Sequence, residues 1–203
     1  MAAKKKASKT TKKAAPKSAA KRVAKKVDAK SKAKAKTKPA GKKVKRPARK
    51  RVSAVPAGFT TATPYLIVRG AARALEFYGR AFGAKEKVRM EMGPGVIAHA
   101  EMKIGDSMIM LSEENLQWGS QSPETLGGNA THVMLYVKDA DAFVARAVAA
   151  GATVVMPLEN MFWGDRYGKI RDPFGHQWSI GTHIEDPPPR EIRKRTEAFM
   201  KSM

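Results

Sequence analysis

Hydrophobic positions change spacing several times between residues 59 and 112, and each change predicts a new element. A short apolar run over 61–68 indicates a strand. Apolar residues over 71–82 then recur at helical spacing and stop before Gly83, which is a favourable helix C-cap. Further apolar runs, separated by Gly- and Pro-containing turns, predict three more strands, over 84–90, 96–104 and 107–112.

The same order begins again after a polar segment over 113–129. A strand is predicted over 131–137, a helix over 139–150 that ends at Gly151, and strands over 153–158, 168–171 and 176–183. Val68 and Val137 occupy matching positions 69 residues apart, so the two halves form an internal sequence repeat. Each half has the order βαβββ, and a single half would leave one face of its sheet exposed. The pattern therefore predicts an α+β fold of two paired modules, 59–115 and 129–183.

Two segments carry a more specific signal than the element order. The first, LIVRGAARALEFYGRAFG over 66–83, is similar to the opening strand and helix of a vicinal oxygen chelate module. The second, DRYGKIRDPFGHQWSI over 165–180, resembles the closing hairpin of the second such module. The resemblance to this glyoxalase, bleomycin-resistance and dioxygenase superfamily implies a half-open barrel with a concave cavity over 58–184. It also implies lyase, isomerase or dioxygenase-like chemistry, so whether the chain is an enzyme stays open.

Metal-dependent members of that superfamily hold a divalent ion with a His or Gln on the first strand and a Glu on the last strand of each module. The matching positions here are Thr63, Met110, His132 and Ser179. Of these, His132 alone is an ordinary ligand type. We therefore expect no metal and no other cofactor, and a metal site would need donors from elsewhere, such as His99 or Glu101.

The segment FWGDRY over 162–167 combines aromatic, acidic and basic residues, and we expect it in a loop, where binding residues often gather. The alternative is a surface pair of Asp165 with Arg166 while Trp163 packs on the barrel. His132 has two interpretations, a ligand-binding residue or a strand histidine with a satisfied ring. The loop after Glu113, which bears Trp118, is either a ligand cover or a solvated linker. The predicted cavity residues are Tyr65, Met110, His132, Trp163, Asp165, Arg166 and Tyr167.

The excess of positive charge is confined to the N-terminal segment 1–57. Residues 1–51 hold 23 of the 40 Lys and Arg and a single acid, Asp28, whereas the remaining residues hold 17 of each sign. A segment built from Lys, Ala and Pro cannot bury enough apolar surface to fold, so we expect a disordered tail. Its pieces resemble the tails of linker histones, which implies sequence-independent binding of nucleic acid or polyphosphate; the alternative is a solubilising tail. The candidate phosphate contacts are Lys12, Lys13, Lys42, Lys43, Lys45, Arg46, Arg49, Lys50 and Arg51.

The C-terminal segment 185–203 opens with a Pro-rich turn and predicts a helix. Its stripe of Ile192, Phe199, Met200 and Met203 favours packing along the barrel or across a homodimer rather than on a membrane. The chain contains no Cys, which excludes disulfides and thiolate chemistry, and no apolar run nears the roughly 20 residues of a membrane span. We expect a cytoplasmic protein, with association to the nucleoid as an alternative.

Two classes of function follow from these patterns. The first is a small-molecule enzyme or binding protein of the vicinal oxygen chelate type with a degenerate metal site. The second is a nucleoid- or RNA-associated protein whose barrel serves dimerisation or ligand sensing. A small-molecule ligand is the expected partner of the barrel, and a polyanion that of the tail.

Overall fold

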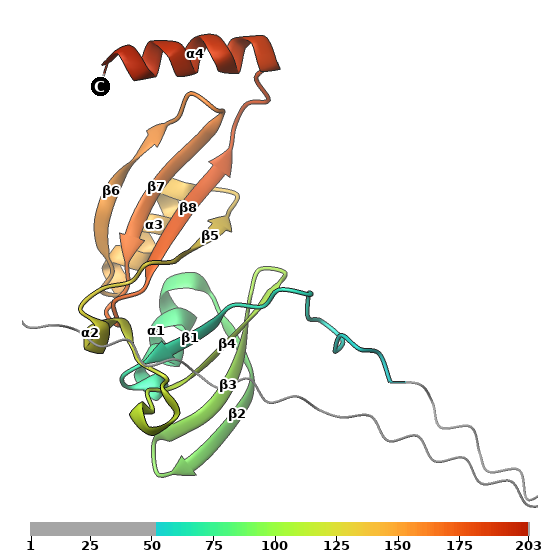
Figure 1. The fold of residues 1–203 in the computed structure, drawn as a ribbon, viewed down its shortest axis with the longest axis vertical. Helices are drawn as coiled ribbons and strands as arrows, with labels where there is room; N and C mark the ends of the chain where they lie inside the picture. Colours follow the sequence, from blue (N-terminus) through green and yellow to red (C-terminus); the bar gives the residue numbers. More distant parts are fainter. Residues whose placement is uncertain (1–51, 203) are drawn as a thin grey trace, which may run out of the picture. The chain divides into compact units, whose positions relative to one another are not determined.

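A computed structural model describes residues 52–202 and shows two βαβββ modules in succession (Figure 1). Module 1 contains β1 (Tyr65–Val68), α1 (Ala71–Phe82), β2 (Lys85–Gly93), β3 (Val96–Ile104) and β4 (Ser107–Glu113). Module 2 contains β5 (His132–Tyr136), α3 (Ala140–Ala150), β6 (Thr153–Asn160), β7 (Asp165–Arg171) and β8 (Gln177–His183). The connecting segment holds the short helices η1 (Leu116–Trp118) and α2 (Pro123–Leu126), and the chain continues into α4 (Pro189–Ser202). The predicted α+β class and the internal repeat are confirmed.

Each module forms a four-stranded mixed sheet with the same strand order. The orders are β1-β4-β3-β2 and β5-β8-β7-β6, with the first strand parallel to the last and the other pairs antiparallel. Alternate residues of each strand point toward the helices, as Leu66 and Val68 do on β1. The remaining residues of each strand form a second face, called here the open face of the module.

The closing strand of each module also caps the helix of that module. In module 1, the Glu113 carboxylate accepts hydrogen bonds from the backbone N–H groups of Gly70 and Ala71, at 2.7 and 2.8 Å. In module 2, the Thr182 hydroxyl accepts from the N–H of Ala140 at 2.9 Å. Both helices therefore begin on a group supplied by the last strand, which accepts one or two of the N–H groups that have no partner within the helix.

Aromatic packing between α1 and α3 joins the two modules into one core. Phe82 stacks on Phe143, with ring centroids 5.3 Å apart, and also meets the edge of the fully buried Trp178. The buried Asp172 carboxylate accepts from the Tyr78 hydroxyl at 2.7 Å and from the Trp178 indole at 2.8 Å. It also accepts the backbone N–H groups of Phe174 and His176. Burial, and then the charge of Asp172, raise the pKa of Tyr78 well above its ordinary 10.0.

Two expected segment boundaries are wrong. Asp165, Arg166 and Tyr167 lie on β7 rather than in a loop, because β7 begins at Asp165, which pairs with His183 of β8. The sequence predicted a strand that begins at Gly168, but Gly168 lies inside β7. The β6 backbone approaches closely there, since a Cβ at this position would lie 2.9 Å from the Met156 carbonyl oxygen.

The polar segment 113–129 also contains more structure than expected. The Asn115 side chain accepts from the N–H groups of Gln117 and Trp118, and the Ser122 hydroxyl accepts from the N–H of Thr125. These residues are N-caps of η1 and α2, a role that Asn and Ser side chains favour.

Helix α4 follows a Pro-rich turn, as predicted, and is attached at the end of module 2. Both Glu185 carboxylate oxygens accept from the Arg195 guanidinium, at 2.7 and 2.8 Å, and the Phe199 ring lies 5.2 Å from the Phe162 ring. None of the residues of α4 is buried. Within residues 52–202, no helix is long and apolar enough to cross a membrane. The predicted tail lies almost entirely outside the described residues.

Candidate functional site

The open face of module 1 is lined by alternate residues of three neighbouring strands. Tyr65 and Ile67 on β1 pair in register with Met110 and Ser112 on β4. Since neighbours in register point to the same side of a sheet, these four residues share one face. The predicted cavity residues Tyr65 and Met110 are therefore neighbours.

A hydrogen-bonded chain of three ionisable side chains crosses this face. The Tyr65 hydroxyl lies 2.9 Å from Nδ1 of His99, and Nε2 of His99 lies 3.4 Å from a carboxylate oxygen of Glu101. The carboxylate thus orients the imidazole, and the imidazole orients the phenol. This arrangement can pass a proton between Tyr65 and Glu101.

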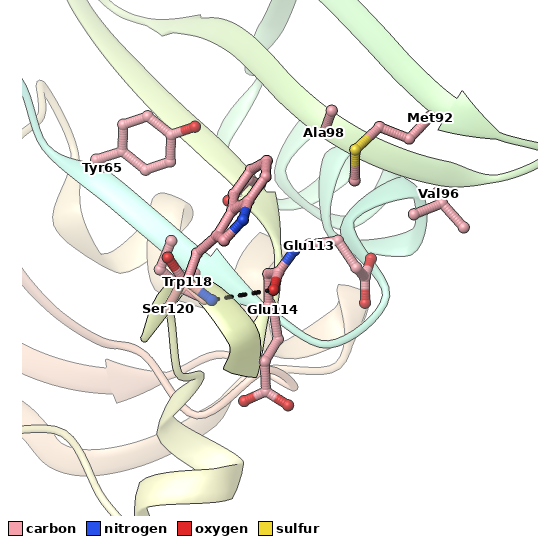
Figure 2. A pocket seen from close by; sticks show the side chains of 11 residues that line it. Tyr65, Met92, Val96, Ala98, Glu113, Glu114, Trp118 and Ser120 are labelled. Atoms are coloured by element: carbon pink, nitrogen blue, oxygen red, sulfur yellow. Dashed lines mark hydrogen bonds between the residues drawn. The ribbon is translucent and has the colours of Figure 1, made fainter.

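Next to this chain lies a cleft of about 560 Å³. Figure 2 shows Tyr65 and Trp118 on one side of the cleft and Met92 and Val96 across from them. Trp118 is 77 % exposed, and the other three are between 41 and 58 % exposed, although all four are large apolar or aromatic side chains. Its other lining residues are Ile67, Ala98, Ser112, Glu113, Glu114, Asn115 and Ser120.

The loop that carries Trp118 is held in place by side-chain hydrogen bonds. Asn115 caps the turn of η1, and Glu114 accepts from both the backbone N–H and the hydroxyl of Ser122, at 2.7 and 2.8 Å. Hydrogen bonds from Thr125 and Ser122 lower the pKa of Glu114, so its carboxylate is ionised at neutral pH, with the Arg69 guanidinium 3.9 Å away. From the sequence, this loop could be either a ligand cover or a solvated linker. In the structure, its side chains form one wall of the cleft.

The open face of module 2 is organised around the buried carboxylate of Asp165. One of its oxygens accepts from the Trp163 indole at 2.9 Å and the Tyr136 hydroxyl at 3.1 Å, and the other lies 2.8 Å from Nδ1 of His183. The Tyr167 hydroxyl lies 2.9 Å from the Ser179 hydroxyl, and its ring contacts that of Trp163. Trp163, Asp165 and Tyr167 are therefore brought together, as the sequence suggested, but their polar atoms are already paired with one another.

The ionisation of this cluster follows from its hydrogen bonds. The bond to Asp165 raises the pKa of Tyr136, so its phenol stays protonated at neutral pH. Hydrogen bonds to Asp165 and then to Asp186 raise the pKa of His183 above its ordinary 6.5. The carboxylate of Asp165 is thus surrounded by donors, and the cluster is a closed polar network.

Arg166 takes no part in that network. Its guanidinium binds both carboxylate oxygens of Asp141, each at 2.7 Å, and also contacts Asn160. The alternative of a surface pair between Asp165 and Arg166 is therefore wrong. Arg166 alternates with Asp165 and Tyr167 along β7, which directs it to the opposite face of the sheet.

The four positions that the superfamily uses for metal binding do not fit a metal in this chain. The Thr63 hydroxyl donates to the Thr60 carbonyl oxygen at 3.3 Å, Ser179 is bonded to Tyr167, and Met110 presents a thioether. His132 lies exposed at the start of β5. Elsewhere, His99 and Glu101 form a pair, and within residues 52–202 no three His, Cys, Asp or Glu side chains are grouped to hold an ion. We derive no chemistry through a metal at these positions.

Sequence reasoning missed Met92 and Val96, which flank the β2–β3 turn. The predicted strands over 84–90 and 96–104 left Met92 in the turn and Val96 at the start of a strand, and nothing in the local pattern directed either side chain into a cleft. The nine basic residues predicted to bind nucleic acid, between Lys12 and Arg51, lie outside the described residues.

The repeated βαβββ modules, each with a four-stranded mixed sheet and the same strand order, define the fold class of the chain. The family model of the Glyoxalase/Bleomycin resistance protein/Dioxygenase superfamily matches residues 59–180, so the chain belongs to this superfamily.

Relatives of the chain are found in bacteria and plants. An uncharacterized protein of Mycobacterium bovis is 42 % identical over 134 residues, which cover 64 % of this chain and 88 % of that protein. An Arabidopsis thaliana protein, At5g48480, is 33 % identical over 114 residues, covering 52 % of this chain and 67 % of its own length. The X-ray structure of that plant gene product is similar with a TM-score of 0.50 at 30 % identity, covering 63 % of this chain and 99 % of the plant chain.

Proposed function

We propose that the domain is a small-molecule binding protein whose ligand lies in the module 1 cleft. The observation that carries this proposal is the set of large, exposed side chains that converge there, Tyr65, Met92, Val96 and Trp118. Exposed apolar groups that line a concavity are unfavourable in water unless a ligand or partner covers them. The predicted cavity residue Tyr65 belongs to this site, whereas Trp163 and Tyr167 lie in the closed cluster of module 2.

The chemistry of the lining selects the kind of ligand. Trp118 and Tyr65 offer ring faces, which favour a planar, partly apolar molecule and contribute contact area at low entropic cost. The Tyr65 hydroxyl either donates to or accepts from His99, so it offers such a ligand an acceptor in the first case and a donor in the second. The carboxylates of Glu113 and Glu114 are already bonded, to the start of α1 and to Ser122, and Arg69 lies 3.9 Å from Glu114, so a neutral aromatic compound fits the cleft best.

Binding is tested with a thermal-shift screen of neutral, cationic and anionic aromatic compounds, followed by titrations of tryptophan fluorescence. Trp118→Ala is expected to lower the affinity for a bound compound by about tenfold or more, a typical cost of removing an aromatic anchor. Leu116→Ala is the matched control, because Leu116 is 62 % exposed in the same short helix but does not line the cleft. If no compound raises the melting temperature, or if both variants bind equally well, the proposed site is wrong.

A second function is proposed for the tail, namely sequence-independent binding of nucleic acid or polyphosphate. Its support is the charge distribution: the excess of 22 positive charges falls within residues 1–51, and the rest of the chain is formally neutral. The experiment compares duplex DNA binding by the whole chain and by a chain lacking residues 1–55 across a salt series. Each phosphate contact contributes a slope of about −0.9 in log K against log salt, so the whole chain should show a steep slope that the truncated chain lacks. Equal affinity of the two chains would contradict this function.

A further inference from the structure

Tyr65 differs from the other tyrosines of the chain in the group to which its hydroxyl is bonded. The chain has four tyrosines, and all of them lie within the described residues. Tyr78 and Tyr136 donate to buried carboxylates, and Tyr167 is bonded to a serine hydroxyl. Of the four, Tyr65 alone is bonded to an imidazole, that of His99. A carboxylate beside a phenol holds the proton on the phenol oxygen, whereas a neutral imidazole is a base that can take it.

The carboxylate of Glu101 sets the direction of the hydrogen bond between Tyr65 and His99. An ionised carboxylate only accepts, so Nε2 of His99, which lies 3.4 Å from Glu101, carries its hydrogen. The other nitrogen of a neutral imidazole is then bare, and Nδ1 accepts from the Tyr65 hydroxyl at 2.9 Å. Within residues 52–202, Glu101 forms no ion pair with Lys or Arg, so its charge acts on the imidazole. The order of hydroxyl, imidazole and carboxylate is that of a side chain activated through a histidine.

The phenol end of this hydrogen-bonded chain is the end that a ligand reaches. Tyr65 is 47 % exposed and lines the cleft of module 1 together with Trp118 (Figure 2). The side chains of His99 and Glu101 are 22 and 20 % exposed and do not line the cleft. A base must lie within hydrogen-bond reach of the proton that it removes. Tyr65 is therefore the group that touches a ligand, and His99 and Glu101 act through it.

The surroundings of Tyr65 suit a neutral ligand with a carbonyl group. Ser112 shares the open face with Tyr65 and lines the same cleft, so its hydroxyl is a donor for a carbonyl oxygen. The ring of Trp118 offers an aryl group a surface on which to stack. Negative charge that develops on a carbonyl oxygen is stabilised by a fixed donor beside it. Together these groups favour the removal of a proton from the carbon next to a carbonyl group.

We propose that Tyr65 is a catalytic acid–base residue, activated by His99 and Glu101, that transfers a proton of a neutral aryl ketone bound in the cleft. The choice of substrate rests on the proposed function, whereas the activation of Tyr65 rests on its own hydrogen bonds. His99 and Glu101 are positioning residues in this assignment.

The proton transfer has two steps and needs no oxidant or reductant. In the first step, the Tyr65 oxygen takes a proton from the carbon beside the carbonyl while its own proton passes to Nδ1 of His99. The electron pair of the broken C–H bond forms a carbon–carbon double bond, and the negative charge moves to the carbonyl oxygen. In the second step, Tyr65 gives a proton to the enolate and regains one from His99. The side chains return to their first state, and Glu101 stabilises the imidazolium that exists between the steps.

The first test measures the activation of Tyr65 in the whole chain with benzenesulfonyl fluoride, a neutral aryl electrophile. An O–S bond forms at the phenol, fluoride leaves, and the phenol proton passes to the neighbouring base. Mass spectrometry of the digested chain should show Tyr65 labelled about tenfold faster, or more, than Tyr136, which is 65 % exposed but bonded to a carboxylate.

Variants of the imidazole and the carboxylate make this test specific. His99→Ala should remove the faster labelling of Tyr65, and imidazole added to the solution should restore part of it, which a merely structural role of His99 would not allow. Glu101→Gln should slow the labelling by a smaller factor. Equal labelling of Tyr65 and Tyr136 in the wild type, or a Tyr65 rate that His99→Ala leaves unchanged, would overturn the proposal.

The dependence of the labelling rate on probe concentration separates this proposal from the proposed binding site. A Tyr65 rate that saturates in the wild type and becomes linear in Trp118→Ala indicates binding in the cleft before reaction. A linear rate that still falls in His99→Ala would contradict the binding site and support the activation of Tyr65. A saturating rate that does not depend on His99 would support the binding site and contradict the activation.

The second test follows the proton transfer itself, with phenylacetone as the neutral aryl ketone. NMR in deuterated water measures exchange of the hydrogens on the carbon beside the carbonyl in the presence of the whole chain. Tyr65→Phe should lower the catalysed rate by about 100-fold, the lower end of what a general base contributes. Tyr136→Phe is the matched control and should leave the rate unchanged. Exchange no faster than in buffer, or equal rates for the wild type and Tyr65→Phe, would show that Tyr65 does not transfer the proton.

Discussion

The two modules share one frame, but their open faces are used in opposite ways. Strand register places His99 and Glu101 of β3 where module 2 has Tyr167 and Lys169 of β7. In module 1, the aromatic and apolar groups around these positions remain exposed beside a cleft, whereas in module 2 the side chains bond to one another around Asp165. The comparison shows that a cluster of aromatic and charged residues is not in itself a binding site: what matters is whether its polar atoms and ring faces remain free.

The frame common to both modules should be the most sensitive to substitution. Asp172→Ala removes the acceptor of four donors, two of them side chains on α1 and β8. Because unsatisfied buried donors cost roughly 1–3 kcal/mol each and water can reach some of them, we expect a loss of about 4 kcal/mol in the free energy of unfolding. Urea denaturation measures it, with the turn residue Asp106, replaced by Ala, as the control. A loss below about 1 kcal/mol would show that the hydrogen bonds of Asp172 contribute little to the stability of the core.

Trp118 and Trp163, one beside each open face, test the contrast between the faces most directly. Trp163→Ala deletes a half-buried ring and a donor to Asp165, so it should cost about 2 kcal/mol of stability. Trp118→Ala should change stability by less than about 0.5 kcal/mol, because that side chain is 77 % exposed. Chemical denaturation of the two variants gives both values, and the opposite order would reverse the assignment of the open and closed faces.

Tyr78 provides a pH-dependent measure of the shared core. Its pKa in the folded state is raised above 10.0, so the folded state holds the phenol proton more tightly than the unfolded state does. Its contribution to stability is therefore complete below pH 10.0 and is lost as the pH rises through the folded pKa. Tyr78→Phe should cost about 1 kcal/mol at neutral pH and make the alkaline fall in stability shallower. Identical alkaline profiles for the variant and the wild type would contradict this account.

His183 gives the smallest effect, a titration at the edge of the closed cluster. Hydrogen bonds to Asp165 and Asp186 raise its pKa above 6.5, so its stabilising contribution is full below pH 6.5 and lost as the pH rises through the folded pKa. NMR titration of the imidazole should show the raised pKa, and Asp186→Asn should lower it. Asp106→Asn should leave it unchanged. A His183 pKa at or below 6.5 would mean that the cluster does not hold the charged imidazole.

Local signals predicted the fold well because they depend on short distances along the chain. Gly83 and Gly151 end their helices with left-handed backbone conformations, as their positions suggested, and the 69-residue repeat defined the modules. The sites were harder to predict because their partners are distant in sequence. Tyr65 and His99 are 34 residues apart, and Tyr136 and Asp165 are 29 apart. Strand alternation indicates which face a side chain occupies, but it does not indicate which polar groups will satisfy one another there.

The hydrogen bond between Tyr78 and Asp172 joins residues 94 positions apart, and this separation bears on how the protein folds. Contacts between distant residues require a large loop to close before they contribute, which slows folding and makes it cooperative. Neither module can complete its aromatic core without the other, since α1 contributes Tyr78 and the turn before β8 contributes Asp172. The two modules therefore behave as one cooperative unit, and a chain reduced to a single module would expose half a core to water.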